Sequence, residues 1–146
     1  MASVKSVNIT NLDASPSVMI DSARNTGTLQ VWHDTYEASS LASGSDITIG
    51  RIPAGATIHD VILKCDALGG SSTLKVGDSG DDDRYLAAVG TWNAAGQAQS
   101  MLAGSTAPNT AVLGLGYKVE VATDLKITTG GATISGSIYF WVHYSV

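Results

Sequence analysis

Short apolar runs separated by turn residues recur along most of the chain. Between residues 45 and 87, three strand-like runs are divided by Pro53-Ala54-Gly55, by Gly69-Gly70-Ser71-Ser72 and by an aspartate cluster. Runs broken by turn residues about every 8–12 positions are typical of antiparallel β-sandwiches and barrels. Apolar residues at helical spacing with caps are missing, so we expect an all-β antiparallel β-sandwich of about eight to ten strands. A jelly-roll-like topology is favoured, because two-sheet closure protects sheet edges, with a simpler meander sandwich as the alternative.

The first and last predicted strands each have two distinct faces, because side chains along a strand alternate with a period of two. At the start, Leu29, Val31 and His33 alternate with Gln30, Trp32, Asp34 and Tyr36. At the end, the expected core face carries Ile134, Ile138, Phe140, Val142, Tyr144 and Val146. The other face carries Ser135, Ser137, Tyr139, Trp141, His143 and Ser145. Its aromatic rings suit a half-wet contact surface.

Two further patterns concern the region before the last strand. Residues 117–121 alternate apolar with charged positions and predict a strand. A second alternating run then leads into Gly130-Gly131, and Gly-Gly between two such runs indicates a two-residue hairpin, since primed turns need positive φ. Residues 90–111 are rich in small and polar residues, so we expect a long connection there with one short strand.

The N-terminal residues 1–27 differ from the rest of the chain. Polar residues surround two small apolar islands, and the second consists of Val18, Met19 and Ile20. This segment is interpreted either as an N-terminal arm or as a first strand followed by a long loop. Residues 28–146 are expected to form a single β-sandwich domain, because 146 residues can bury a sizeable core.

Composition narrows the classes of partner. Thirteen acidic against eight basic residues give a formal charge of −5, and the basic residues are scattered, so we expect no nucleic-acid binding. Charged residues make up 14% of the chain against a usual value of about 25%. Such a surface suits wide contacts with another protein. The sequence shows neither a charged-then-apolar leader nor an apolar run approaching 18 residues, so we expect no signal peptide and no membrane contact.

Residues able to carry chemistry are few. His33, His59 and His143 lie on three predicted strands without the spacing of metal ligands, which disfavours a zinc site. Cys65 is the single cysteine and sits in an apolar run, where we expect a buried structural thiol. The chain has no nucleophile elbow or phosphate loop. We therefore expect no enzyme and no cofactor.

The aspartate cluster allows three interpretations. Asp78, Asp81, Asp82 and Asp83 lie within six residues and repel one another unless a positive group is near. A solvated acidic turn paired with Arg84 is favoured. A contact with a basic patch on a partner and a weak calcium site are the alternatives, although the spacing does not match a helix-loop-helix calcium loop.

About half of the chain resembles small structural proteins associated with the heads of tailed bacteriophages. The resemblance is carried by residues 32–37 (WHDTYE), 52–56 (IPAGA) and 66–78 (DALGGSSTLKVGD), together with the last dozen residues. These are packing and turn motifs, so they indicate a scaffold more than an activity. Proteins of this kind are typically capsid decoration or cement proteins.

The resemblance implies a virion protein that binds the outside of the mature capsid and bridges its subunits. The implied partners are the major capsid protein lattice and further copies of the chain, with a homotrimer favoured and a dimer as the alternative. Synthesis in the host cytoplasm precedes a location on the outer capsid surface. The residues we expect at such interfaces are Val18, Met19, Ile20, Trp32, Tyr36, Tyr139 and Trp141.

Two other functions remain open at this stage. A tail, neck or fibre-base protein would use the same sandwich and the same low charge. A carbohydrate- or receptor-binding sandwich would need the rings of Trp32, Trp92, Tyr139 and Trp141 to be exposed and clustered.

Overall fold

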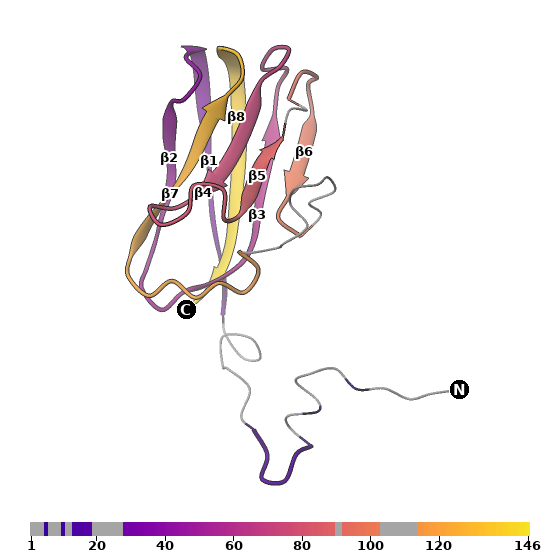
Figure 1. The fold of residues 1–146 in the computed structure, drawn as a ribbon, viewed down its shortest axis with the longest axis vertical. Coiled ribbons are helices and arrows are strands. Elements are labelled where there is room, and N and C mark those ends of the chain that lie inside the picture. The colour runs from indigo at the N-terminus through magenta and orange to yellow at the C-terminus, as the bar shows by residue number, and fades with distance from the viewer. Residues whose placement is uncertain (1–4, 6–9, 11–12, 19–27, 90–91, 103–113) are drawn as a thin grey trace, which may run out of the picture.

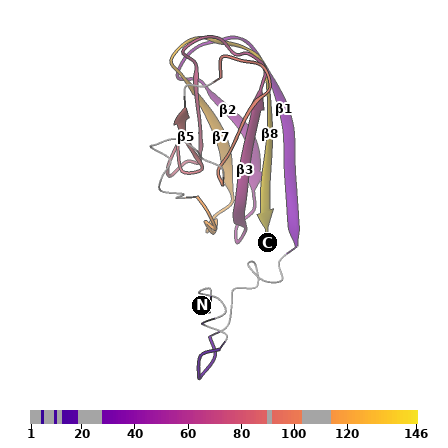
Figure 2. The same cartoon turned by 90° about the vertical axis from the view of Figure 1, so that its right-hand side faces the viewer.

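The structure of the protein is a computed structural model that describes residues 5, 10, 13–18, 28–89, 92–102 and 114–146. Within these residues, eight strands form two sheets that face one another (Figure 1), and the two layers are seen from the side in Figure 2. The strands are β1 (Leu29–Leu41), β2 (Asp46–Ile52), β3 (Thr57–Cys65), β4 (Thr73–Gly77), β5 (Leu86–Val89), β6 (Gln97–Ser100), β7 (Thr123–Gly130) and β8 (Ile134–Ser145). This confirms the expected all-β sandwich. Among the described residues, no helix is long and apolar enough to span a membrane.

The strand order is that of a jelly roll. Sheet A has the order β1-β8-β3-β6 and sheet B the order β2-β7-β4-β5, and all neighbours are antiparallel. Only β4 and β5 are both consecutive in sequence and adjacent in a sheet, so every other connection crosses between the sheets. The jelly-roll topology favoured from the sequence is thereby confirmed over the meander.

The core lies between the two sheets and follows the period-two pattern. Ile138, Phe140 and Val142 of β8 are at most 2% exposed, and Leu125 and Ile127 of β7 face them from sheet B with no exposure. Burying a side chain of this size contributes about 1.5–3 kcal/mol each. The predicted core face of the last strand is correct, except that Val146, beyond the end of β8, is 59% exposed.

The predicted hairpin at Gly130-Gly131 is wrong. β7 belongs to sheet B and β8 to sheet A, so the two strands do not pair, and residues 131–133 form a corner between the sheets. Gly131 is needed there for two reasons. Its φ is +74°, and a Cβ atom would lie 1.9 Å from the carbonyl oxygen of Ser71. Gly-Gly correctly indicated a tight turn. Two-residue hairpins and corners between sheets both use glycine at positive φ, so the residue type alone does not distinguish them.

The predicted strand at residues 117–121 is also wrong. Only Lys118 makes an isolated β-bridge, to Thr57, and Val121 is 75% exposed. The segment is held instead by backbone hydrogen bonds to the turn before β3: the Val119 N–H donates to the Ala56 carbonyl, and the Gly55 N–H donates to the Val119 carbonyl. Alternation here reflects a single buried side chain, Val119, between exposed neighbours. The short strand expected within residues 90–111 is present as β6.

The two ends of the sandwich differ in what they carry. At one end, the lower one in Figure 1, β1 begins and β8 ends, and the loops 53–56 and 114–122 lie there. The 78–85 loop joins the ends of β4 and β5 that point the same way, and it lies above these two loops in Figure 1. We call this end, the 78–85 loop included, the termini end. At the opposite end lie the loops 42–45, 66–72 and 131–133.

Candidate binding surface

A buried carboxylate organises the β4–β5 loop at the termini end. Asp78 is 8% exposed, and its Oδ1 accepts hydrogen bonds from the backbone N–H groups of Gly80 (2.8 Å) and Asp81 (3.1 Å). Its Oδ2 accepts from Arg84 Nε and from the Tyr85 hydroxyl, both at 2.9 Å. Because both carboxylate oxygens are engaged within the loop, Asp78 acts as a structural centre.

Arg84 and Tyr85 complete this network. The Arg84 guanidinium lies 4.2 Å from the centre of the Tyr117 ring, and the Tyr85 and Tyr117 rings meet edge to face. Burial opposes the charge of Arg84, but Asp78 attracts it, and the net effect raises the pKa of Arg84. Burial, followed by the neighbouring Asp78 carboxylate, raises the pKa of Tyr85, so this hydroxyl remains a donor. The network fastens the acidic loop to the segment before β7.

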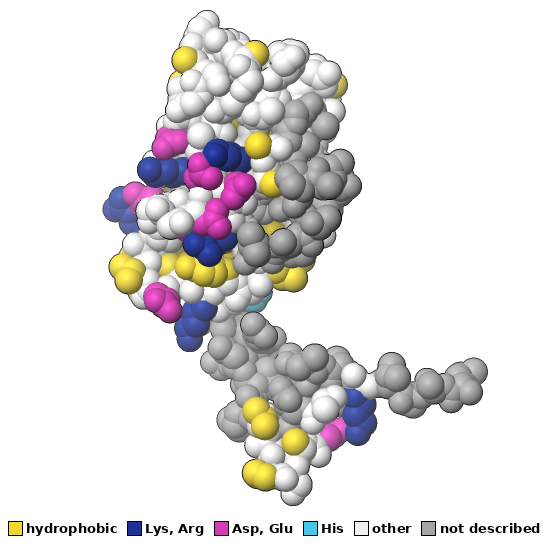
Figure 3. Space-filling view, viewed as in Figure 1, with side chains coloured by type: hydrophobic (Ala, Val, Ile, Leu, Met, Phe, Trp, Pro, Cys, Tyr) yellow, Lys and Arg dark blue, Asp and Glu magenta, His cyan; other side chains and the backbone are white. Residues whose placement is uncertain are grey.

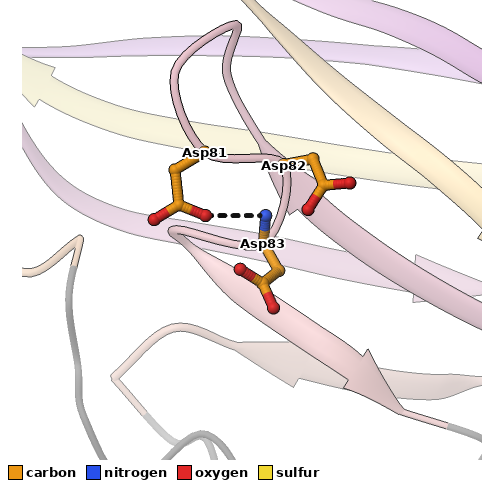
Figure 4. Close-up of side chains that lie close together, drawn as sticks. All are labelled: Asp81, Asp82 and Asp83. Atoms are coloured by element: carbon orange, nitrogen blue, oxygen red, sulfur yellow. Dashed lines mark hydrogen bonds between the residues drawn. The ribbon is translucent and has the colours of Figure 1, made fainter.

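The other three aspartates form a separate, more exposed group. One oxygen from each of Asp81, Asp82 and Asp83 lies within 4.8 Å of the others (Figure 4), and the Asp83 N–H donates to Asp81 Oδ1 at 3.3 Å. Lys75 pairs with Asp82. A hydrogen bond to Asp81, burial and the negative charges of Asp81 and Asp82 together raise the pKa of Asp83. The structure thus divides the four aspartates of the proposed turn into a structural one and an exposed trio. Exposed carboxylates of this kind are common on acidic proteins, and we assign no metal to them.

The aromatic residues expected at interfaces lie on two different faces. Tyr139 and Trp141 are half-buried on the outer face of sheet A, opposite Thr35 and His33 of β1. Trp32 and Tyr36 point the other way, toward sheet B, because they pair with the core positions of β8.

Trp32 and Tyr36 also differ from each other. Trp32 is 40% exposed and lies against Gly50 of β2, where a Cβ atom would come within 3.2 Å of its ring. It covers the open edge between β1 and β2, beside a shallow depression lined by Asp34, Arg51 and Asp124. Tyr36 is partly buried and packs against the core.

The remaining interface candidates belong to the N-terminal segment. Val18 is 52% exposed, and Met19 and Ile20 lie outside the described residues. Residues 13–18 are all exposed and lie apart from the two sheets in both views (Figure 2). The seven candidates therefore do not form one surface within the described part of the chain.

The requirement for a carbohydrate-binding surface is not met by these rings. Trp92 is 1% exposed, and Trp32 lies on the opposite face of sheet A from Tyr139 and Trp141. Without a cluster of exposed rings there is no platform on which a sugar would stack. This alternative loses the observation on which it depended.

The histidines and the cysteine lie as their strands predict. His33, His143 and His59 are on β1, β8 and β3, and His59 Nε2 is 2.8 Å from the Ser145 hydroxyl. Cys65 is 1% exposed, as expected of a structural thiol, and burial together with the nearby Asp66 raises the pKa of its thiol to about 11.

Charged side chains gather on sheet B and its loops, in the lower half of the face shown in Figure 3. Arg51 and Asp124 pair at 2.7 Å between β2 and β7, and Lys126 lies 3.7 Å from Asp46. Four of the five ion pairs found in the described residues belong to this sheet or to the β4–β5 loop. This face is polar and internally paired, so it offers little apolar area to a partner.

A group of exposed aliphatic side chains at the termini end was not predicted from the sequence. They are Leu29, Leu115, Val121 and Val146, each at least 50% exposed. Figure 3 shows hydrophobic side chains along this lower rim of the sandwich. One signal was available: Leu115 stands between Gly114 and Gly116, and a large aliphatic residue held in a glycine turn is poorly placed to enter a core.

Solved structures of bacteriophage capsids contain chains with the same fold. A chain in the capsid asymmetric unit of cyanophage Pam1 is 23% identical, with a TM-score of 0.68 and an alignment covering 92% of this chain and 96% of that one. A chain in the capsid of Ralstonia phage GP4 is 20% identical, with a TM-score of 0.56 and coverage of 83% and 84%. A chain in the acidic stable capsid of Helicobacter pylori bacteriophage KHP30 is 9% identical, with a TM-score of 0.61 and coverage of 83% and 90%.

Sequence comparison adds no further relative, since no family model and no curated protein matches the chain. At these levels of identity the similarity establishes the fold: this chain is a jelly roll of the kind found in bacteriophage capsids.

Proposed function

We propose that this protein is a non-enzymatic structural component of a bacteriophage virion that binds the outside of the mature capsid and stabilises the shell. The observation that carries the proposal is the alignment with the Pam1 capsid chain, which spans nearly all of both chains. The two aligned chains are thus of similar length, and the alignment covers nearly all of each.

Stabilisation follows from linkage. A protein that binds the expanded shell and not its free subunits adds the free energy of every such contact to the assembled state. Each contact can be weak, because contacts that are linked and repeated over the lattice add up to a high overall avidity for the shell. Such a protein needs a rigid fold and one adherent surface, and it needs no catalytic group.

The direct test is co-sedimentation of the purified protein with mature shells that lack it. We expect binding to expanded shells and little binding to free capsid subunits. Equal binding to both, or to neither, would contradict a stabilising role.

Gold-labelled antibody on intact virions separates the head from the tail. We expect label spread over the head. Label confined to the tail or neck would support a tail, neck or fibre-base protein, which uses the same fold and the same low charge.

A homotrimer is the assembly we propose on the lattice, because a small protein placed at threefold or quasi-threefold points is most simply a closed trimer. Sedimentation equilibrium of the free protein is expected to give three times the 15.0 kDa chain mass. A dimer would instead place the protein at twofold points by the same symmetry argument.

We also propose that residues 1–27 act as an arm that reaches neighbouring shell subunits. Limited proteolysis should trim these residues from the free protein and spare them on particles. Equal protection in both states would remove the arm from the proposal.

A further inference from the structure

Among the described residues of the sandwich, the large hydrophobic side chains that are exposed all lie toward one end. Leu29 and Val146 flank the pairing of β1 with the end of β8, since Leu29 lies opposite Ser145. Leu115 and Val121 extend from the segment that hydrogen-bonds to the start of β3 and to the turn before it. Exposed apolar patches that are rimmed by polar residues are one of the marks of a protein–protein interaction site.

The remaining exposed large hydrophobics of the sandwich lie in the same half. Val31 and Trp32 pair with His143 and Val142, near the end of β8, and Leu102 donates its N–H to Asp60 in the first half of β3. The exposed apolar surface is therefore polarised along the strands.

The opposite end carries none of these groups among its described residues. Its loops, 42–45, 66–72 and 131–133, consist mostly of alanine, serine, glycine and threonine, and Leu68 within them is 2% exposed. An end that exposes mostly small side chains offers a partner little apolar area, and so little free energy of burial.

The place where the chain enters the fold indicates what covers the apolar end. Residues 1–28 precede β1 in the sequence, and β1 begins at Leu29, within the exposed group. This preceding segment therefore joins the sandwich at the termini end. The arm proposed above and the exposed apolar side chains share one end, and this shared position is the reason to assign that end to the partner.

We propose that the termini end docks on the outer surface of the assembled shell through Leu115, Val121 and their neighbours, and that the opposite end points away from it. This inference rests on the proposed function and deepens it, by naming the surface that meets the shell. The partner surface presents aliphatic side chains to this end, because burial of apolar area is what the exposed group can supply.

The first test compares two double variants in shell co-sedimentation. Leu115→Asp/Val121→Asp places charges on the docking end, and the matched control Ala42→Asp/Ala67→Asp places the same charges on exposed positions of the opposite end. We expect the first variant to lose at least about tenfold in affinity, and the control to stay within about twofold of the wild type. All four positions are exposed, so we expect both variants to fold. Circular dichroism and thermal melting check this.

The outcomes separate the inference from the function on which it rests. Failure of the wild type to bind shells overturns the proposed function and the docking surface together. Binding by the wild type with equal affinity for both variants, or with a loss confined to the control, overturns the docking surface alone. We also expect the wild type to keep its binding at high salt, because salt does not screen apolar contacts. Loss of binding at high salt would mean that the contact is electrostatic and not apolar.

A labelling experiment measures the orientation without altering affinity through charge. Val121→Cys and Ala42→Cys each add one exposed thiol to a chain whose own Cys65 is buried. With maleimide, both should react in the free protein. On shells the cysteine at position 121 should be protected and the one at position 42 should react fully. The reverse pattern would show that the opposite end faces the shell.

Discussion

The two ends of this sandwich are closed by different means. At the opposite end, backbone and hydroxyl groups hold the loops: the Thr129 hydroxyl donates to the Ala42 carbonyl at 2.9 Å, and the Ser72 hydroxyl donates to the Gly69 carbonyl at 2.9 Å. At the termini end, charged and aromatic side chains hold them, through Asp78, Arg84 and Tyr117. The opposite end is compact because its residues are small. The termini end is compact because its large side chains contact one another.

This difference shows how one fold can separate stability from binding. Residues at the opposite end are mostly small, and the hydroxyl groups of Thr129 and Ser72 hydrogen-bond to backbone carbonyls of its loops. Large residues at the termini end build the Asp78 network beneath a rim of aliphatic side chains that the fold itself does not use. Substitutions should therefore act through charge at one end and through backbone geometry at the other.

The largest effect is expected from Asp78→Ala. The change leaves the Arg84 guanidinium and the Tyr85 hydroxyl without their shared acceptor, and removing one partner of a buried ion pair costs about 3–5 kcal/mol. Urea denaturation measures the loss. Asp81→Ala, at a more exposed position in the same loop, is the matched control and should cost less than about 1 kcal/mol. Equal losses would mean that the loop is held by its turn geometry and not by the Asp78 network.

Gly131→Ala should give the largest loss at the opposite end. The added Cβ would meet the Ser71 carbonyl oxygen at 1.9 Å and the residue has positive φ, so we expect about 2–4 kcal/mol from overpacking and backbone strain. Gly44→Ala is the control, because its φ is also positive, at +83°, while no atom lies within 4 Å of the added Cβ. Its cost should be about 1 kcal/mol. Chemical denaturation measures the two losses of stability. Equal losses would mean that the close approach to the Ser71 carbonyl oxygen is not the cause.

Loss of a hydroxyl at the opposite end should cost less. Thr129→Val keeps the shape of a side chain that is 2% exposed but removes its bonds to the Ala42 carbonyl and to the Ser45 N–H, so we expect about 1–2 kcal/mol. The neighbouring Thr128→Val removes an exposed bond to Asp46 and should change stability by less than about 0.5 kcal/mol. Thermal melting distinguishes the two. A larger loss at Thr128 would contradict closure by buried hydroxyl groups.

The sequence predicted the layers of this fold better than its connections. Alternation along β8 identified Ile138, Phe140 and Val142 as core, because each strand obeys the same period-two rule wherever it is placed. The Gly130-Gly131 corner was mistaken for a hairpin because glycine at positive φ satisfies either connection. The choice between them depends on which strands pair, and β8 finds its partners in β1 and β3, far away in sequence.

The positions of the candidate interface residues in the fold were harder to predict, for a related reason. Trp32 and Tyr139 are both aromatic residues on strands, yet the direction of each relative to the core places them on opposite faces. The aliphatic rim is made of residues from three separate segments, namely the start of β1, the 114–122 loop and the end of the chain after β8, which only the folded topology brings to one end. Val121 even continued an alternating pattern, although its segment forms no strand.

The smallest effect concerns the exposed aspartates of the termini end and depends on pH. A side-chain hydrogen bond to Asp81, burial, and the charges of Asp81 and Asp82 raise the pKa of Asp83 in the folded protein. As the pH rises past the unfolded value of 3.8, the unfolded chain therefore binds fewer protons than the folded one. Stability therefore falls as the pH rises from there through the higher folded pKa, and the penalty is fully present above it. Asp83→Asn should remove this penalty, so the variant should match the wild type in acid and melt slightly higher at neutral pH. Asp66→Asn, at an exposed position of the opposite end, is the control and should not reproduce this pH-dependent gain. A lower melting temperature for Asp83→Asn at neutral pH would show that this carboxylate stabilises the loop. In that case the attraction of the Asp83 carboxylate to nearby positive groups at the termini end would outweigh its repulsion by Asp81 and Asp82.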